Sequence, residues 1–156
     1  MDYIVETSRE FTPDKVPSDK LKKCAKKVIE ELLNRAKKLD SNDKRVSRMI
    51  KRLEGSMNTI YDSSYNTNAI SVEVNDTISE GKDTLEFVIK ILKSKGFIIP
   101  KNTKGSSDIY IKKFDDSTVV AKLIEGKAFG RSTVTIVLYT TSNVNESTIF
   151  ESVQML

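Results

Sequence analysis

The chain has 156 residues and contains no histidine, no tryptophan and a single cysteine, Cys24. The lack of histidine excludes serine or cysteine triads with an imidazole base, His-ligated metal sites and switches that depend on imidazole titration. One cysteine excludes both an internal disulfide bond and a thiolate zinc site. Most familiar catalytic machinery is therefore absent, and we expect a non-enzymatic protein without a metal or cofactor.

The sequence also lacks the features of a membrane or secreted protein. No stretch approaches the roughly 18 apolar residues that a membrane span requires. Asp2 and Glu6 stand where a signal peptide carries bases, and no apolar run follows them. We expect a cytoplasmic protein that does not bind membranes. Lysine outnumbers arginine 20 to 6, a bias associated with AT-rich genomes such as those of many low-GC bacteria and their phages.

The formal net charge of +4 is an average over unequal segments. Residues 1–19 carry two bases and five acids, residues 20–53 carry thirteen bases and four acids, and residues 69–156 carry eleven of each sign. This distribution predicts an acidic N-terminal segment over residues 1–17, a basic amphipathic helical region over 18–61 and a neutral α+β domain over 69–156.

The basic region has the apolar periodicity of helices. Two stripes recur at helical spacing: Leu21, Ala25, Val28, Ile29, Leu32, Leu33, Ala36 and Leu39, then Val46, Met49, Ile50, Leu53, Met57 and Ile60. Between them, residues 40–43 (Asp-Ser-Asn-Asp) prefer caps and turns to helix interiors. This pattern predicts two antiparallel helices, over about 18–40 and 43–61.

A second interpretation is one long helix of the coiled-coil type. A heptad spacing continues without a break across residues 40–43, through Ala25, Leu32, Leu39, Val46, Leu53 and Ile60. Unbroken phase is typical of a single helix about 65 Å long, in which four poor helix formers would cost about 2–3 kcal/mol. Either way the stripe needs a partner, and a second copy of the chain is one candidate, which would make a homo-oligomer.

The bases cover the remaining helical surface with few acids to relieve their repulsion. They can be a solvated face, or a surface for nucleic-acid phosphates, which neutralise like charges and release counterions. No aromatic residue interrupts the basic run before Tyr61, so duplex backbone contact fits better than stacking on bases. The candidate phosphate-binding residues are Lys22, Lys23, Lys26, Lys27, Lys44, Arg45, Arg48, Lys51 and Arg52.

The C-terminal part alternates strand and helix patterns. Ile70, Val72 and Val74 alternate with polar residues, residues 85–92 carry a helical stripe, and residues 97–99 form a short extended run. Three strands follow, over about 108–114, 117–125 and 131–141, and Thr148 with Glu151 predicts a short last helix. The expected fold is α+β: a basic helical hairpin, or one long helix, followed by a small antiparallel sheet with helices on one face.

The segment from Gly126 to Thr133 superficially matches a phosphate-binding loop. That loop needs four residues between its glycines, then lysine and a helix, whereas here three residues intervene, the base is Arg131 and a strand follows. We therefore interpret the segment as a hairpin tip that brings Lys127 and Arg131 to a nucleic-acid backbone, as secondary candidates.

A further motif combines Asp115 or Asp116 with Glu125 and Lys127 in Glu125-Gly126-Lys127. It resembles the Asp…Glu-x-Lys core of restriction-endonuclease-like nucleases, in which two carboxylates hold a divalent cation and the lysine helps to activate water. The same tripeptide recurs at residues 80–82, which shows how easily it arises. The resemblance implies a Mg²⁺-dependent nuclease as a minor alternative.

These observations favour a non-enzymatic accessory or regulatory protein that binds nucleic acid, with double-stranded DNA as the expected partner. The alternative is a protein-interaction module, such as a phage-type inhibitor or adaptor of a host protein, that uses the apolar heptads or a sheet face.

Overall fold

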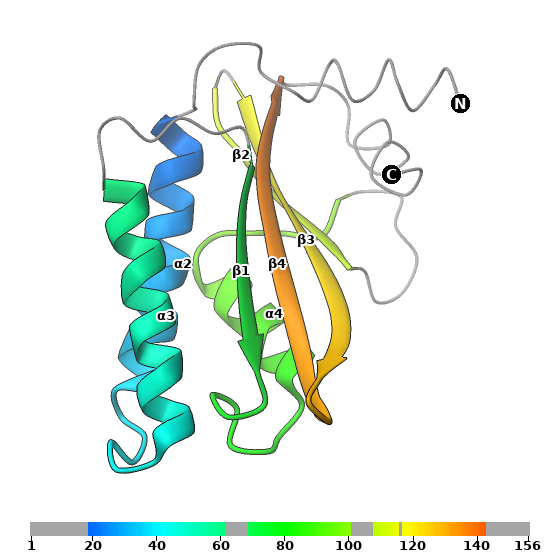
Figure 1. Cartoon of the computed structure of the whole chain (residues 1–156). Coiled ribbons are helices and arrows are strands. Elements are labelled where there is room, and N and C mark those ends of the chain that lie inside the picture. The colour runs from blue at the N-terminus through cyan, green and yellow to red at the C-terminus, as the bar shows by residue number, and fades with distance from the viewer. Residues whose placement is uncertain (1–18, 62–68, 101–107, 116, 143–156) are drawn as a thin grey trace.

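The computed structural model describes residues 19–61, 69–100, 108–115 and 117–142. Along these residues run α2 (Asp19–Ala36), α3 (Lys44–Tyr61), β1 (Ala69–Asn75), α4 (Thr84–Ser94), β2 (Ile109–Lys113), β3 (Ser117–Ala128) and β4 (Arg131–Ser142) (Figure 1). The expected α+β class is confirmed. The predicted acidic N-terminal segment, the predicted last helix and Asp116 lie outside the described residues.

The basic region forms a helical hairpin, so the alternative of one continuous helix is wrong. α2 ends at Ala36, four residues before the predicted end, and α3 runs back beside it (Figure 1). The connection is held by its own polar groups: the Asp40 carboxylate accepts from the Asn42 N–H at 3.0 Å, and Asp43 accepts from the Arg45 N–H at 2.9 Å. These local bonds outweigh the heptad phase because one satisfies a backbone N–H within the connection and the other satisfies a backbone N–H in the first turn of α3.

The four strands form one antiparallel sheet in the order β1-β4-β3-β2. The alternation read from the sequence of β1 is confirmed, because Ile70, Val72 and Val74 are buried while Ser71 and Glu73 are exposed. The segment 97–99 is not a strand: it makes only a single bridge, between Ile98 and Ile111.

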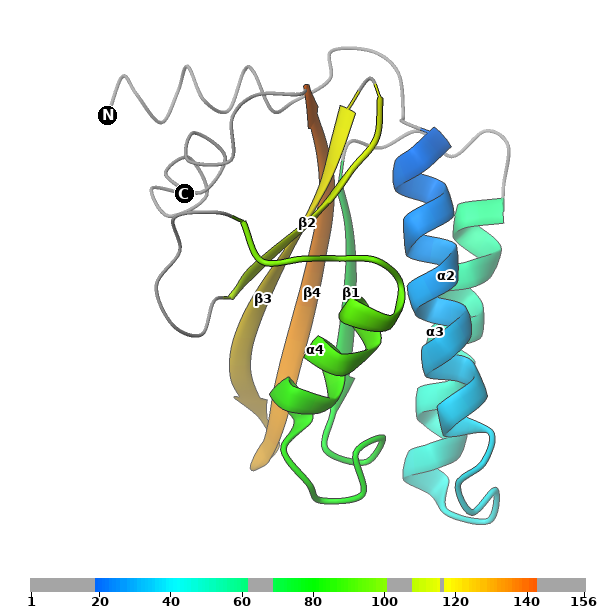
Figure 2. The same cartoon turned by 180° about the vertical axis from the view of Figure 1, so that it is seen from behind.

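The described helices pack against one face of the sheet and share its core. Figure 2 shows α4 in front of the sheet and the helical hairpin to the side of it, with α3 behind α2; α2 contacts β1, β3 and β4, and α3 contacts the edge strand β1. The core joins apolar residues of both hairpin helices, of α4 and of all four strands, among them Leu32, Leu53, Leu92, Tyr110 and Ile136. The heptad stripe thus finds its partner within the chain, since Ala25, Leu32, Val46, Leu53 and Ile60 are all buried.

Three connections lie at one end of the molecule, the lower end in Figure 1. They are the α2–α3 connection, the loop from β1 to α4 and the tip of the β3–β4 hairpin. Within the described ranges, no helix is long and apolar enough to cross a membrane.

Candidate functional site

Three arginines lie along the flank of α3 that faces the sheet edge. Arg45, Arg48 and Arg52 follow at spacings of three and four, which places them on one side of a helix whose neighbouring side, with Met49 and Leu53, is buried in the core. All three are exposed and line one groove of about 390 Å³. The groove is completed by Glu73, Asn75 and Thr77 from β1 and its loop and by Ala128, Phe129, Arg131 and Thr133 from the β3–β4 hairpin.

We call this site the arginine groove: Arg45, Arg48, Arg52 and Arg131, with Glu73 as the only acidic side chain in its described lining. It joins an α-helix, an edge strand and a hairpin tip that are distant in the sequence. Four of the six arginines of the chain therefore meet at one place.

The hairpin tip has a two-residue turn. Ala128 pairs with Arg131, and between them Phe129 has φ 53° and Gly130 has φ 77°. Positive φ at both central positions is the pattern of a type I′ turn, which favours Asn-Gly because a bulky residue at the first position is strained. The Phe129 side chain is nevertheless fully exposed, with a relative accessibility of 105%.

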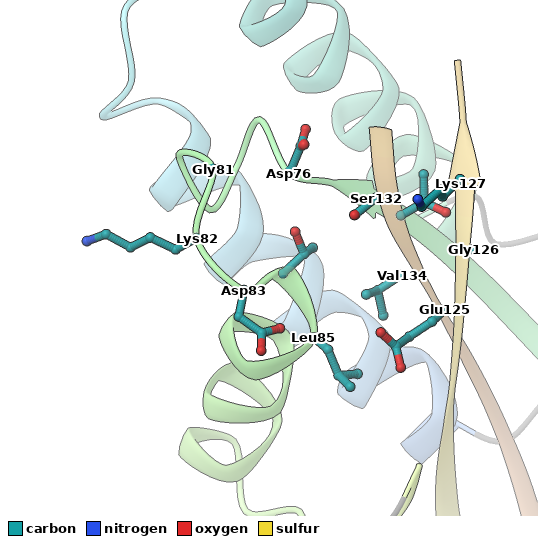
Figure 3. A pocket seen from close by; sticks show the side chains of 12 residues that line it. Asp76, Gly81, Lys82, Asp83, Leu85, Glu125, Gly126, Lys127, Ser132 and Val134 are labelled. Atoms are coloured by element: carbon teal, nitrogen blue, oxygen red, sulfur yellow. The ribbon is translucent and has the colours of Figure 1, made fainter. Parts of the chain in front are cut away.

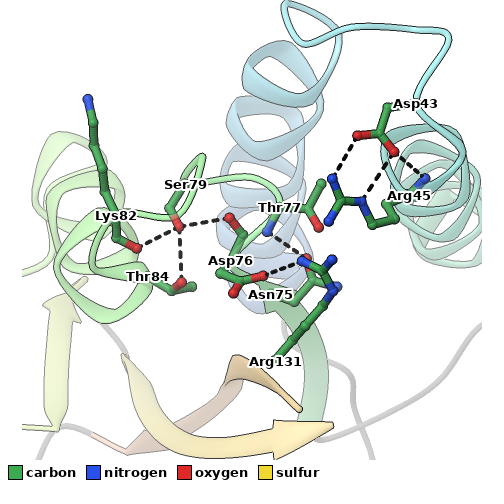
Figure 4. Close-up of polar contacts among 9 residues, drawn as sticks. All are labelled: Asp43, Arg45, Asn75, Asp76, Thr77, Ser79, Lys82, Thr84 and Arg131. Atoms are coloured by element: carbon green, nitrogen blue, oxygen red, sulfur yellow. Dashed lines mark hydrogen bonds and ion pairs between the residues drawn. The ribbon is translucent and has the colours of Figure 1, made fainter. Parts of the chain in front are cut away.

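Carboxylates hold three of the four guanidinium groups. Arg131 donates to Asp76 at 3.0 Å and Arg45 to Asp43 at 3.1 Å (Figure 4), and Arg52 lies 3.6 Å from Glu73. The hydrogen bonds from Arg45 lower the pKa of Asp43 and in turn raise the pKa of Arg45. Arg48 makes no ion pair with any described residue. A guanidinium has five N–H donors, so each paired arginine keeps donors for a further acceptor.

The loop between β1 and α4 fixes the acid that orients Arg131. The Asp76 N–H donates to the Ser132 carbonyl at 3.1 Å, and the Ser79 hydroxyl lies 2.9 Å from the Lys82 carbonyl and 3.0 Å from Thr84 Oγ1 (Figure 4). The first of these bonds joins the loop to the hairpin, and the two bonds of Ser79 hold the loop together at the start of α4.

A second cavity, of about 640 Å³, lies on the other side of the tip (Figure 3). Glu125 and Lys127 line it from β3, and Asp76 and Asp83 line it from the loop before α4. The Asp83 carboxylate is already engaged, since it caps α4 by accepting from the Glu86 N–H at 3.1 Å. Across the described part of the chain, no cluster of three or more acidic or cysteine side chains could hold a metal ion.

The nuclease motif gains no support from this geometry. Glu125 and Lys127 do share a cavity, but Asp115 lies at the opposite end of β3. Eight residues of extended strand separate Ser117 from Glu125, about 26 Å, so Asp115 and Glu125 cannot bind one ion. Asp116 lies outside the described residues.

The structure divides the eleven predicted site residues. Lys22, Lys23, Lys26 and Lys27 lie at the far end of the hairpin, where the Lys26 ammonium is 4.1 Å from the centre of the Tyr61 ring. Lys44 and Lys51 are exposed on α3 but do not line the groove, and Lys127 lines the second cavity instead. Arg45, Arg48, Arg52 and Arg131 are the predicted residues that the fold brings together.

Comparison with known proteins adds no family. The chain matches no protein-family model, and searches of curated proteins and of solved structures also find no match. Its function must therefore be argued from its own geometry.

Sequence reasoning missed Phe129 and the orienting acids Glu73 and Asp76. Phe-Gly at a predicted hairpin tip was the available signal for Phe129, because an aromatic residue there is unusual. Cys24 can be set aside as a site: it is buried, and this burial raises the pKa of its thiol despite the nearby Lys112 and Lys27. A thiol of that kind is a poor nucleophile.

Proposed function

We propose that this protein binds nucleic acid without catalysis, with double-stranded DNA as the expected partner, through phosphates seated in the arginine groove. The convergence of Arg45, Arg48, Arg52 and Arg131 on one groove is the observation that carries the proposal. In this role the protein would be an accessory or regulatory factor in the cytoplasm.

Arginine is the residue suited to this task. Its planar guanidinium presents a fork of N–H donors that matches two phosphate oxygens, whereas the lysine ammonium acts as a point charge. The chain has more than three times as many lysines as arginines, yet the described lining of this groove contains four arginines and no lysine. The overall excess of bases in the chain does not explain why arginines and not lysines line the groove.

The orienting acids support binding rather than oppose it. Asp43 and Asp76 do not line the groove: they line an adjoining cavity together with Arg45 and Arg131, which they hold at 3.1 and 3.0 Å. Only Glu73 shares the groove, and its contact with Arg52 is longer, at 3.6 Å. A guanidinium fixed in this way loses less side-chain entropy when a phosphate arrives.

A charge reversal in the groove tests the proposal. We expect Arg45→Glu combined with Arg48→Glu to weaken the binding of a DNA duplex at least about tenfold, because two phosphate contacts become repulsions. The measurement is a fluorescence anisotropy titration of a labelled duplex at several salt concentrations.

The matched control places the same charge change at the far end of the hairpin. Lys23 and Lys27 are exposed on α2, so Lys23→Glu with Lys27→Glu changes the net charge equally while leaving the groove intact. We expect this control to bind nearly as the parent does. Equal losses in both variants, each folded by circular dichroism, would show that net charge alone drives binding and would refute the groove.

A further inference from the structure

The aromatic residue at the hairpin tip has no role in the fold. Phe129 exposes its whole side chain, and its φ of 53° is unfavourable for a bulky residue. Asparagine would relieve both costs, because it tolerates left-handed backbone and is polar. A ring kept at such a position points to an interaction with something outside the chain.

The surroundings of Phe129 indicate what that partner is. Phe129 is one of the residues that line the arginine groove together with Arg45, Arg48 and Arg52, and Arg131 follows it two residues later. In a nucleic acid each phosphate is linked to a base whose flat face stacks well on an aromatic ring. A phosphate held by the groove would bring its own base, or the adjacent one, towards the tip.

We propose that Phe129 stacks on an exposed nucleobase, and that the arginine groove therefore selects nucleic acid in which a base face is accessible. This inference rests on the proposed function. In a continuous duplex both faces of every base are covered by neighbouring pairs, so inserting a ring costs the unstacking of a step. A bulge, a gap or a single strand offers the face without that cost.

The arrangement suits one base rather than a row of them. Proteins that follow a single strand stack successive bases on several aromatic residues. In the groove lining, Phe129 is the only aromatic side chain among the described residues. Four arginines and one ring match the backbone of a duplex that carries one unpaired or unstacked base.

The experiment compares three DNA ligands with one protein. The ligands are a continuous duplex, the same duplex with a single bulged base, and the corresponding single strand. We expect the wild-type chain to bind the bulged duplex about tenfold more tightly than the continuous one, the size of effect that one stacked base gives. Equal affinity for the bulged duplex and the single strand, both bound more tightly than the continuous duplex, would also support stacking.

Two substitutions at Phe129 test the contribution of its aromatic ring to binding. Phe129→Asn keeps a favourable type I′ turn and removes the aromatic face, so it should lose the preference for the bulge but still bind the continuous duplex in a salt-dependent way. Phe129→Trp should keep the preference. Since the chain contains no other tryptophan, its emission reports on the tip alone and should be quenched by the bulged duplex.

Tyr61→Trp is the control for the fluorescence measurement, because Tyr61 is 57% exposed at the far end of the hairpin. Its emission should not change with any ligand. If wild type binds all three DNA ligands equally and Phe129→Asn behaves like it, stacking is refuted while nucleic-acid binding stands. If wild type binds none of them at low salt, the proposed function itself fails.

Discussion

Phe129 combines two local costs that a residue selected for stability would avoid. Its backbone lies in the left-handed region at φ 53°, and its ring is fully exposed to solvent. The neighbouring Gly130, by contrast, suits the same turn. For a bulky L-residue the left-handed conformation costs about 1–2 kcal/mol, and asparagine recovers much of this. Phe129 therefore lowers the stability of the fold, while its exposed ring is available to a ligand.

This account predicts that Phe129→Asn raises the free energy of unfolding by about 1 kcal/mol. Urea titration followed by circular dichroism measures the change. Phe129→Ala is the comparison, since it removes the ring but keeps a non-glycine residue of poor left-handed propensity, and it should gain less. A loss of stability in Phe129→Asn would mean that the ring packs against the protein and is not available to a ligand.

At the scale of elements, one carboxylate joins two helices. Glu31 of α2 accepts from Arg35 of the same helix at 2.9 Å and lies 3.2 Å from the Lys95 ammonium at the end of α4. The hydrogen bonds from Arg35 and then Lys95 lower the pKa of Glu31 below its ordinary 4.5. The Lys95 carbonyl in turn accepts from Lys112 of β2 at 2.9 Å, so the contact extends to the sheet.

A lowered pKa means that Glu31 stabilises the fold while it is ionised, and that this contribution disappears as the pH falls through its folded-state pKa. We expect Glu31→Gln to lower the free energy of unfolding at pH 7 by about 0.5–1 kcal/mol, as for a partly exposed ion pair. The difference from wild type should shrink as the pH falls below 4.5. Urea titrations of both proteins over this pH range measure this difference. A difference that stays constant with pH would contradict the role of ionised Glu31.

The elements themselves could be predicted from the sequence, because periodicity reports directly on which face is buried. The stripes ending at Leu39 and beginning at Val46 predicted α2 and α3, and the alternation at Ile70, Val72 and Val74 predicted β1. The continuous-helix interpretation from the heptad phase across residues 40–43 is wrong, since phase does not report whether Asp40 will bond within a turn and Asp43 will cap the next helix.

The site could be predicted only in part, because it depends on how elements meet. In an antiparallel hairpin the start of one helix lies beside the end of the other, so Lys23 and Arg45, each near the start of its helix, lie at opposite ends. Because both residues are bases on amphipathic helices, the charge pattern alone could not show which of the two lies in the groove. Arg131 reaches the groove through the pairing of β4 with β1, and that long-range register has no signal in the local sequence.

For the molecule as a whole, the modest net charge of +4 conceals two separate basic regions. One is the lysine-rich start of α2 and the other is the arginine groove, at opposite ends of the same hairpin. The proposal assigns binding to the second region alone. That assignment can be tested, because the salt dependence of the binding affinity reports the number of phosphates that a protein neutralises.

Four arginine contacts predict a plot of log K against log salt with a slope of about −3.6 on duplex DNA. If all eleven bases named from the sequence made contacts, the slope would be about −10.

Arg48→Gln should reduce the magnitude of the slope by about 0.9, whereas Lys23→Gln should leave it unchanged because Lys23 lies at the far end of the hairpin. Phe129→Asn should weaken binding to a bulged duplex without changing the slope, since stacking releases no counterions. A steep slope reduced equally by Arg48→Gln and Lys23→Gln would instead spread the interface over the whole helical hairpin.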